Sequence, residues 1–363
     1  MKNKIIFVLT FFYLFFAVNT VAYSSANENS KKRPVNIILF IGDGMGVAQL
    51  SAGIAVSDKT FVVEHFKYAG YCKTSSFDRY VTDSAAAATA IACGVKTRNG
   101  MLGMGPDTTL VASIMEIAHK NGLATGLVCT SAITHATPAG FVAHNSGRGN
   151  YEDIALDFMK GTIDVFIGGG SNHFKKRKDG KDLTAQFRGQ GYDVVFTLED
   201  LMKSNANKIA GLLDTVHMAR SVDGRFGMLE AMTSKAIETL SRNKKGFILM
   251  VEGSQIDFAG HGKDLAWNVS EVLDMERAVT KAYEFAEKSR NTLVVVTADH
   301  ETGGLALTGG DLKKKTIEAV YATNNHTAVL VPVFSHGPGA ERFTGIIDNT
   351  DFFPIFKELL KLK

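Results

Sequence analysis

The sequence predicts an α/β fold in which helices cover both faces of a central, mostly parallel sheet, a three-layer αβα sandwich. Short apolar runs alternate along the chain with segments whose apolar residues recur at helical spacing. Several of the apolar runs are continuous rather than alternating, which is typical of strands that are covered on both faces. We find no internal repeat, so these observations favour one layered α/β unit.

The predicted elements follow from these runs in chain order. The apolar runs predict strands over residues 35–41, 124–130, 164–167, 246–251, 291–297 and 328–335. Helical spacing predicts helices over residues 84–93, 110–121, 228–242, 265–288 and 352–361. Gly122 is expected just past the end of the second of these helices. Residues 171–227 carry the weakest pattern, and their basic run 175–178 is interpreted as a solvated loop.

The first residues have the pattern of a secretory signal peptide rather than of a folded element. Lys2 and Lys4 precede the apolar run 5–18, and small residues follow it up to residue 26. A membrane-spanning helix needs about 20 apolar residues, and this run is shorter. We therefore expect a signal peptide over 1–22, cut after Ala22 or Ala26, a linker over 23–34 and a single domain over 35–363. The mature chain would be periplasmic or secreted, without a stable membrane anchor.

Composition and charge exclude several classes of protein. Hydrophobic residues make up 45% of the chain and charged residues 21%, which is typical of a globular protein. The 40 Lys and Arg are nearly balanced by 37 Asp and Glu, so a nucleic acid is not expected as a specific partner. Three cysteines, at positions 72, 93 and 129, are too few and too widely spaced for a disulfide framework and are expected to be unpaired.

Acidic residues stand just beyond three of the predicted strands. Asp43 follows the run 35–41, Glu252 follows 246–251, and Asp299 follows 291–297. The carboxyl ends of parallel strands meet at one edge of a sheet, and this edge is where sites form in open α/β folds. Three carboxylates brought together there repel one another unless cations lie between them. The pattern therefore predicts a metal site.

Histidines accompany these carboxylates. His261 lies four residues after Asp257, His300 is adjacent to Asp299, and His326 lies in a polar segment. Mixed histidine and carboxylate ligands suit zinc, whereas carboxylate, hydroxyl and water suit magnesium. Each histidine alone would be interpreted as a surface or core residue, but together with the carboxylates they favour metal binding.

Ser84 is the candidate nucleophile. It lies in the segment Thr82-Asp83-Ser84 immediately before an alanine-rich helical run. Asp83 or Ser84 can act simply as the cap of that helix. The positive end of a helix also favours an anion, and a serine hydroxyl that is ionised by a metal there could attack phosphorus.

Six segments carry a family resemblance. They are IGDGMG at 41–46, VTDSAAAATAIACGVKTRNG at 81–100, THATPAGFVAH at 134–144 with Arg148 after it, VEGSQIDFAGH at 251–261, VTADHETGG at 296–304, and NHT with VFSHGPGA within 325–340. In this order and spacing the chain resembles the bacterial alkaline phosphatases, of the three-metal type with a serine nucleophile, from about residue 35 to its end. The resemblance implies their αβα fold and the hydrolysis of phosphate monoesters.

The resemblance also implies two zinc ions and one magnesium ion per chain. The ligands that it implies for the first zinc are Asp257, His261 and His326. For the second zinc it implies Asp43, Asp299 and His300, with Ser84 bound beside them as the nucleophile. For magnesium it implies Asp43, Thr137 and Glu252. Arg148 would grip two phosphate oxygens as a bidentate fork, and Asp83 would position it.

Two positions depart from the enteric members of the family. His135 stands where those enzymes have an aspartate next to the magnesium site, so the third metal could instead be zinc. Phe258 stands where they have a lysine near the phosphate. The loss of that positive charge should loosen phosphate binding, and we therefore expect faster product release.

The resemblance implies a phosphatase of broad substrate range that is active at alkaline pH. Ser84 would form a covalent phosphoserine, and inorganic phosphate would be released. A homodimer is expected because dimers are common in the family. Two alternatives stay open: a phosphodiesterase or sulfatase of the same superfamily, and a phosphate- or zinc-binding protein without turnover.

Overall fold

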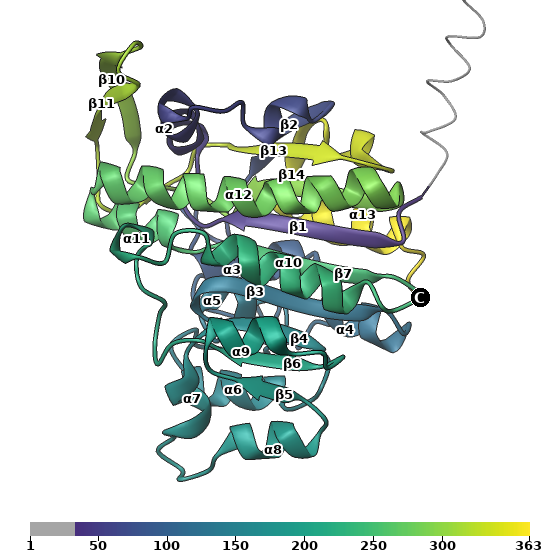
Figure 1. Cartoon of the computed structure of the whole chain (residues 1–363). Helices are drawn as coiled ribbons and strands as arrows, with labels where there is room; N and C mark the ends of the chain where they lie inside the picture. The colour runs from purple at the N-terminus through teal and green to yellow at the C-terminus, as the bar shows by residue number, and fades with distance from the viewer. Residues whose placement is uncertain (1–32) are drawn as a thin grey trace, which may run out of the picture.

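The computed structural model describes residues 33–363, and the predicted signal peptide and most of the predicted linker lie outside this range. The described chain has three layers, a central sheet with helices on both of its faces (Figure 1). The predicted α/β class and mostly parallel sheet are confirmed.

The central sheet has ten strands in the order β14-β2-β13-β8-β1-β7-β3-β4-β6-β5. Their bounds are β1 Asn36–Gly42, β2 Tyr68–Lys73, β3 Ala124–Ala132, β4 Val165–Gly169, β5 Asp193–Val195, β6 Ile209–Leu212, β7 Phe247–Gly253, β8 Thr292–Ala298, β13 Val331–His336 and β14 Gly345–Asp348. Only β13 runs antiparallel to its neighbours in the part of this sheet that the structure describes. Two small two-stranded sheets pair β9 Glu301–Thr302 with β12 His326–Thr327, and β10 Leu305–Asp311 with β11 Thr316–Tyr321.

The middle of the sheet is dry because its strands are apolar on both faces. Every residue of β1, β3, β7 and β8 is buried. Parallel strands covered by helices on both faces have this continuous apolar character, which is why the sequence shows runs rather than alternation. The six strands predicted from these runs all form, with ends that differ by at most three residues.

Helices of two groups cover the sheet. In Figure 1, α10 and α12 lie in front of it, and α3, α4 and α5 lie behind. The helix bounds are α2 Val47–Val56, α3 Ser84–Cys93, α4 Ile114–Lys120, α5 Ala136–Ala139, α6 Tyr151–Phe158, α7 Ser171–Lys175, α8 Leu183–Gly189, α9 Leu198–Lys203, α10 Met228–Leu240, α11 Gln255–Gly262, α12 Leu265–Ser289 and α13 Phe352–Leu359. Short 3₁₀ turns are η2 Val62–His65, η3 Ser221–Asp223, η4 Ala340–Phe343 and η5 Asn349–Asp351.

The register of the central strands places the ends of β1, β7 and β8 at the same level. β1 lies between β7 and β8, with Ile41 opposite Glu252 and Gly42 opposite both Gly253 and Ala298. The residues that leave these three strands therefore emerge side by side at one edge. In Figure 1 the arrowhead of β1 points toward this edge, where α11 and the β10–β11 hairpin also lie.

The weakly patterned segment 171–227 is more ordered than the sequence suggested. It forms α7, α8, β5, α9 and β6, and the last strand of this group pairs with β4 to extend the sheet. The strands have three and four residues and the helices five to seven, which is too short to give a clear periodic signal. The predicted helix 110–121 also begins later, at Ile114, because Ser113 and Glu116 form a capping box there.

The interpretation of residues 175–178 as a solvated loop is wrong for two residues. Lys175 ends α7, while Arg177 is buried. The Arg177 guanidinium donates to both carboxylate oxygens of Asp179 and to the Glu152 carbonyl. A buried arginine satisfied by nearby oxygens has the same sequence signature as an exposed one, so composition did not distinguish them.

Strands β2, β10, β11 and β14 were also not predicted, because they lie at or next to an edge of the sheet or in a hairpin. β2 shows the burial of an exposed strand, and β14 forms the edge beside it. The β10–β11 hairpin projects from the body at the upper left of Figure 1. Half-exposed strands carry polar residues and lack the continuous apolar run used for prediction.

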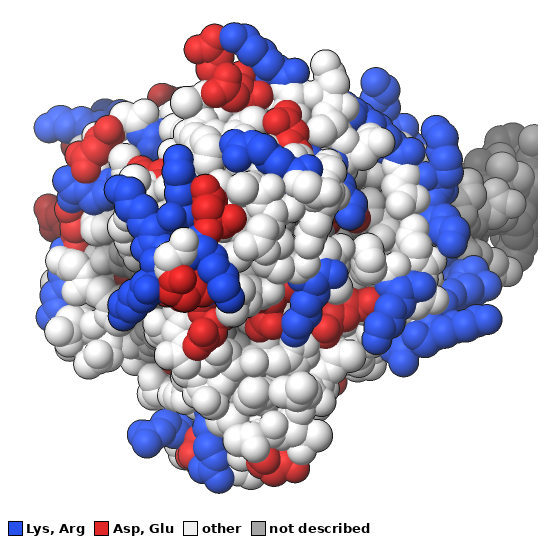
Figure 2. Space-filling view, turned by 90° about the horizontal axis from the view of Figure 1, so that it is seen from below, with Lys and Arg blue, Asp and Glu red and all other residues white. Residues whose placement is uncertain are grey.

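The prediction for the cysteines agrees with the described residues. Cys72, Cys93 and Cys129 are buried and unpaired, as predicted. Within residues 33–363, no helix has both the length and the apolar character needed to cross a bilayer. On the face shown in Figure 2, Asp and Glu side chains lie beside Lys and Arg side chains in several places.

A buried ion-pair network ties the loop before α10 to the long helix α12. Arg225 is 1% exposed and pairs with Glu271 and with Asp274, whose Oδ2 is 2.5 Å from Nη1. Glu271 also accepts from Trp267 Nε1 at 2.9 Å and from the Ser221 amide at 2.8 Å. Every charge in this network has its partner, so removal of one member leaves an uncompensated buried charge.

We expect Arg225→Met to destabilise the fold by about 3–5 kcal/mol, the cost of breaking a buried pair from one side. Urea unfolding followed by circular dichroism measures this change. The matched control is Arg342→Met, since its pair with Glu358 is exposed and its loss should leave the midpoint nearly unchanged. Equal midpoints for the two variants would contradict the account of this network.

Candidate functional site

The candidate site lies where β1, β7 and β8 end. Asp43 follows β1, Glu252 is the next-to-last residue of β7, and Asp299 follows β8; all three are at most 1% exposed. The Asp43 amide donates to the Gly253 carbonyl at 3.2 Å, and the Gly44 amide donates to Asp299 Oδ1 at 3.2 Å. The predicted meeting of these three strand ends is therefore present in the structure.

Gly44 allows the turn after β1 to pass close to other parts of the site. Its φ is +73°, and a Cβ atom there would lie 2.7 Å from Thr302 Oγ1. A side chain would therefore be strained by the backbone conformation and would push Thr302 away. This explains the glycine in the Gly42-Asp43-Gly44 segment.

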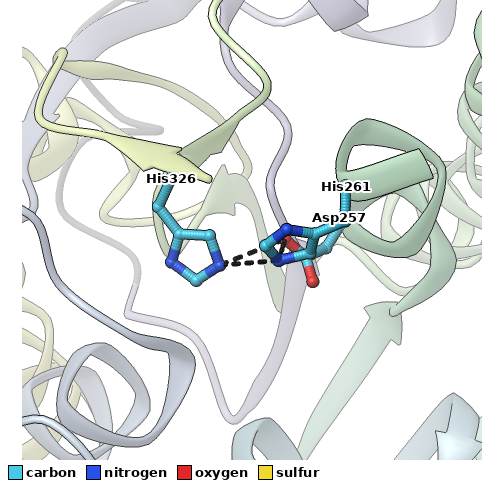
Figure 3. Close-up of side chains that lie close together, drawn as sticks. All are labelled: Asp257, His261 and His326. Atoms are coloured by element: carbon cyan, nitrogen blue, oxygen red, sulfur yellow. Dashed lines mark hydrogen bonds and ion pairs between the residues drawn. The ribbon is translucent and has the colours of Figure 1, made fainter. Parts of the chain in front are cut away.

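A first group of possible metal ligands contains Asp257, His261 and His326. Asp257 and His261 lie one turn apart on α11, and His326 faces them from β12 (Figure 3). The two imidazole Nε2 atoms are 3.1 Å apart, and each is 3.4 Å from Asp257 Oδ1. Three ligand atoms from two elements thus converge on one small volume.

The backbone fixes which nitrogen each imidazole presents. His261 Nδ1 is 2.6 Å from the Asn324 carbonyl, and His326 Nδ1 is 2.9 Å from the Thr82 carbonyl. A carbonyl only accepts, so both Nδ1 atoms carry the hydrogen and both Nε2 atoms have a free lone pair in the neutral ring. This is the orientation that partners of metal-bound histidines impose.

A second group contains Asp43, Asp299 and His300. His300 Nε2 lies 3.4 Å from Asp43 Oδ1 and 3.3 Å from Asp299 Oδ2. Its ring is fully buried and stacks on that of His326 with centroids 3.5 Å apart, so the first two groups adjoin. Burial lowers the pKa of His300 well below its usual value, so its ring is neutral.

Thr302 joins the first two groups. Its hydroxyl donates to Asp257 Oδ1 at 2.5 Å and lies 3.3 Å from His300 Nδ1. Because the Thr302 hydrogen is directed to the carboxylate, the oxygen is left to accept from His300 Nδ1. His300 therefore also presents the lone pair of Nε2.

A third group contains Asp43, Glu252 and His135, with Thr137 nearby in sequence on α5. In residues 33–363, both carboxylate oxygens of Asp43 and of Glu252 are buried without a hydrogen-bond partner, as are Thr137 Oγ1 and His135 Nδ1. A cluster of buried polar atoms without partners is costly unless a cation satisfies it.

Burial and mutual repulsion raise the proton affinity of these carboxylates. Burial, with the charges of Asp299, Asp257 and Glu252, raises the pKa of Asp43 well above its usual value. Burial raises the pKa of Glu252 to about 7 and, with the charge of Asp257, raises that of Asp299 to about 6. Burial lowers the pKa of His135 to about 3, so this ring is neutral and able to bind a cation.

Ser84 begins α3 beside the second group. Its Oγ is 3.2 Å from His300 Nε2, and the side chain is 1% exposed. Asp83 caps the helix by accepting from the Ala86 amide at 2.9 Å. The helix is buried along its whole length, and small alanine side chains let α5 approach closely. Asp83 rather than Ser84 therefore caps the helix, which leaves the Ser84 hydroxyl available to the site.

Arg148 lies between Ser84 and the third group. Its Nη1 donates to Asp83 Oδ2 at 3.0 Å, and its Nη2 lies 3.3 Å from His135 Nε2. The Arg148 guanidinium is thereby held at a fixed place beside the nucleophile candidate. The predicted partnership of Asp83 with Arg148 is present in the structure.

Phe258 forms an apolar wall beside His135. Its ring meets that of His135 edge-on at 5.6 Å and that of His217 at 5.1 Å. His217 comes from the loop after β6, and its Nδ1 accepts from the Ala132 amide at 3.1 Å. His217 and Thr302 are neighbours of the site that the sequence analysis missed; Thr302 lies within the segment 296–304, whereas His217 has no local signal.

Comparisons with known proteins agree with this geometry. The family model described as alkaline phosphatase matches residues 34–318. Alkaline phosphatase 4 of Bacillus subtilis is 34% identical, with 93% of this chain and 91% of the relative covered. The alkaline phosphatase of Escherichia coli K12 is 33% identical, with 92% and 88% covered.

Solved structures of alkaline phosphatases also match this chain. The alkaline phosphatase from the Antarctic bacterium TAB5 matches with a TM-score of 0.87 and 42% identity, covering 91% of this chain and 99% of that one. The Thermus thermophilus alkaline phosphatase matches with a TM-score of 0.86 and 27% identity, covering 93% and 94%. By sequence, fold and the residues that meet at its strand ends, this chain belongs to the alkaline phosphatase family.

Proposed function

We propose that Ser84 is the nucleophile of a metal-dependent phosphomonoesterase and that Arg148 binds the phosphoryl group. One observation supports this most strongly. Ser84 Oγ lies 3.2 Å from His300 Nε2, at the positive end of α3, while Asp83 holds Arg148 beside it. A hydroxyl, a cationic fork and two adjoining groups of metal ligands are the parts that phosphoryl transfer through a covalent intermediate requires.

The chain's residues divide the reaction into two displacements. Ser84 releases its hydroxyl proton to solvent as Oγ attacks phosphorus. An Oγ–P bond forms, the bond to the ester oxygen breaks, and the alcohol leaves with a proton taken up from solvent. Water then attacks the phosphoserine from the side of the departed alcohol, releasing inorganic phosphate and restoring the Ser84 hydroxyl. The Arg148 guanidinium holds two non-bridging oxygens through both displacements, and the first amides of α3 face the same charge. Bound cations supply positive charge and make the serine hydroxyl and water more acidic.

We infer that the metal complement is two zinc ions and one magnesium ion. The first two groups combine imidazole nitrogen with carboxylate oxygen, the ligand set that suits zinc. The third group adds Glu252 and Thr137 oxygens to Asp43, which suits magnesium, although the neutral ring of His135 also suits zinc. A magnesium ion in this fold is supported by a mutant of the TAB5 enzyme that has Mg bound in its M3 site, although that mutant carries aspartate in place of a histidine.

The remaining assignments are proposals of the same kind. We propose that residues 35–363 form one catalytic domain, that residues 1–22 direct export to the periplasm or medium, and that the mature chain is a homodimer. Edman sequencing of the exported protein tests the first boundary, and light scattering tests the oligomeric state.

Phosphate monoesters fit the site better than diesters. Arg148 can pair two of its N–H groups with two of the three free oxygens of a monoester dianion. The deciding experiment compares hydrolysis of p-nitrophenyl phosphate and bis-p-nitrophenyl phosphate at pH 9, before and after chelation and after restoration of zinc and magnesium. Monoester activity that is lost and regained with the metals supports the proposal. Preference for the diester, or for a sulfate ester, would replace it with another hydrolase of the superfamily, and metal binding without turnover would reduce it to a binding protein.

Ser84→Ala should remove the covalent step. We expect no phosphoenzyme burst with p-nitrophenyl phosphate and a kcat lower by at least about 10³-fold, since the displacement loses its nucleophile. Rapid-quench measurement of protein-bound phosphate checks this, with Ser241→Ala at the far end of the sheet as the control. A variant that keeps full activity would remove Ser84 from the role.

The stability of the metal-free protein should fall as pH rises. The pKa of Glu252 is about 7 in the folded chain against an ordinary 4.5, so between these values the folded state binds more protons than the unfolded state. Stability is then lost as pH increases through this window, and bound cations remove the penalty. The gap in thermal midpoint between loaded and chelated protein should therefore widen from pH 5.5 to pH 8.

Glu252→Gln should narrow that gap at pH 8, because it removes one of the repelling charges. Glu199→Gln, in an exposed ion pair, is the control and should leave the gap unchanged. A gap that does not depend on pH in the natural chain would show that these carboxylates are not the source of the metal's stabilising effect.

Phe258→Lys should tighten phosphate binding and slow turnover. The lysine would bring a positive charge to the wall beside His135 and Arg148, where the phosphate oxygens are expected. We expect the inhibition constant for inorganic phosphate and kcat both to fall. A gain of about 1.4 kcal/mol in the free energy of phosphate binding corresponds to a tenfold change. Phe258→Met is the uncharged control. Unchanged phosphate inhibition in the lysine variant would contradict this account of the wall.

A further inference from the structure

Asn99 uses both atoms of its side-chain amide to hold the segment that precedes the nucleophile. Its Oδ1 accepts from the Asp83 amide at 3.2 Å, and its Nδ2 donates to the Val81 carbonyl at 3.1 Å. Thr82 lies between these two contacts and is buried. The orientation of the Thr82 carbonyl is therefore restricted from both sides.

Residues 81–83, which Asn99 restrains, contact several parts of the site. The Thr82 carbonyl accepts from His326 Nδ1 at 2.9 Å and so sets the nitrogen that His326 presents. Asp83 caps α3, on which Ser84 stands, and accepts from Arg148 Nη1. A rotation of the peptides around Thr82 would disturb a zinc-ligand candidate, the nucleophile and the phosphate-binding arginine at once.

Gly100, the residue after Asn99, also links Asp83 to Arg148. The Gly100 amide donates to Asp83 Oδ2 at 2.9 Å, and the Gly100 carbonyl accepts from the Arg148 amide at 2.8 Å. Gly100 has a φ of +89°, a conformation that allows the turn to present its amide and carbonyl in this way. Asn99 and Gly100 together thus hydrogen-bond to Val81, Asp83 and Arg148.

Core packing does not explain Asn99. The side chain lies in the exposed loop after α3, where water could satisfy an amide equally well. Its contacts are instead directed to backbone groups of the nucleophile segment. A side chain of this kind restrains geometry more than it stabilises the fold.

We propose that Asn99 is a positioning residue that aligns Ser84 and Arg148 and holds the Thr82 carbonyl on His326. The inference rests on the proposed roles of those three residues. Loss of the Asn99 amide would let the Thr82 peptide rotate, so His326 would be held less firmly as a ligand and Arg148 and Ser84 would lose their alignment. Partners that orient metal ligands typically change metal affinity by about 10–100-fold when they are removed.

The test is Asn99→Ala against a matched control, Asn243→Ala. Asn243 also uses both amide atoms to hold backbone groups, at Gly122 and Lys245, but it lies at the opposite end of the sheet. Three quantities are measured on zinc- and magnesium-loaded protein: the rate of zinc transfer to a chromogenic chelator, kcat and KM for p-nitrophenyl phosphate, and the thermal midpoint. The inhibition constant for inorganic phosphate reports on Arg148 separately.

For Asn99→Ala we expect zinc transfer and the phosphate inhibition constant to increase, and kcat/KM to fall, each by about tenfold. The thermal midpoint of Asn99→Ala should equal that of Asn243→Ala. The Asn243→Ala variant should have the same kcat and KM as the natural chain. Kinetics and zinc transfer equal to those of the control would overturn the inference. A lower midpoint without faster zinc transfer would also overturn it, since Asn99 would then serve only stability.

The two proposals fail in different ways. If the natural chain hydrolyses no phosphate ester, the proposed function is wrong, whereas faster zinc transfer in Asn99→Ala would still support the link from Asn99 to His326. If the natural chain is active and Asn99→Ala matches the control, only the positioning role is wrong.

Discussion

Repulsion among buried carboxylates is the constraint on which the site depends. Asp43, Glu252 and Asp299 leave three neighbouring parallel strands at one level, and the chain provides too few donors for their oxygens within residues 33–363. The hydrophobic sheet behind them makes this arrangement tolerable, because β1, β7 and β8 are fully buried and cannot shift apart without exposing apolar surface. Burial of the apolar strands therefore keeps these carboxylates close together, where only cations can balance their charges.

Around this centre, the neighbouring groups restrict what each ligand can do. Backbone carbonyls of Asn324 and Thr82, and the hydroxyl of Thr302, assign the hydrogen of three imidazoles to Nδ1. The same segment that holds His326 leads directly into the cap of α3. The nucleophile and the metal ligands are therefore one connected structure, and the positions of both depend on the same few peptide groups.

Much of this arrangement could be predicted from the sequence. Continuous apolar runs located the central strands, and the acidic residues after them located the site, because parallel strands bring their ends together. The assignment of Arg148, Thr137 and Asp83 needed the family resemblance, since their contacts join segments far apart in the chain. The contacts of His217 and Asn99, which lie in loops, and of Thr302, in the two-residue strand β9, could not be predicted, because the paths of these segments follow from tertiary packing rather than local pattern. The short strands of the segment 171–227 were missed for lack of periodicity.

The central claim is that cations balance the buried carboxylates. Anomalous X-ray scattering recorded above and below the zinc edge, from crystals of zinc- and magnesium-loaded protein, tests it most directly. The account predicts two zinc peaks, one among Asp257, His261 and His326 and one among Asp43, Asp299 and His300. It also predicts density for a cation among Asp43, Glu252 and His135. Crystals in which these groups hold no metal and the carboxylates hydrogen-bond to one another would contradict it.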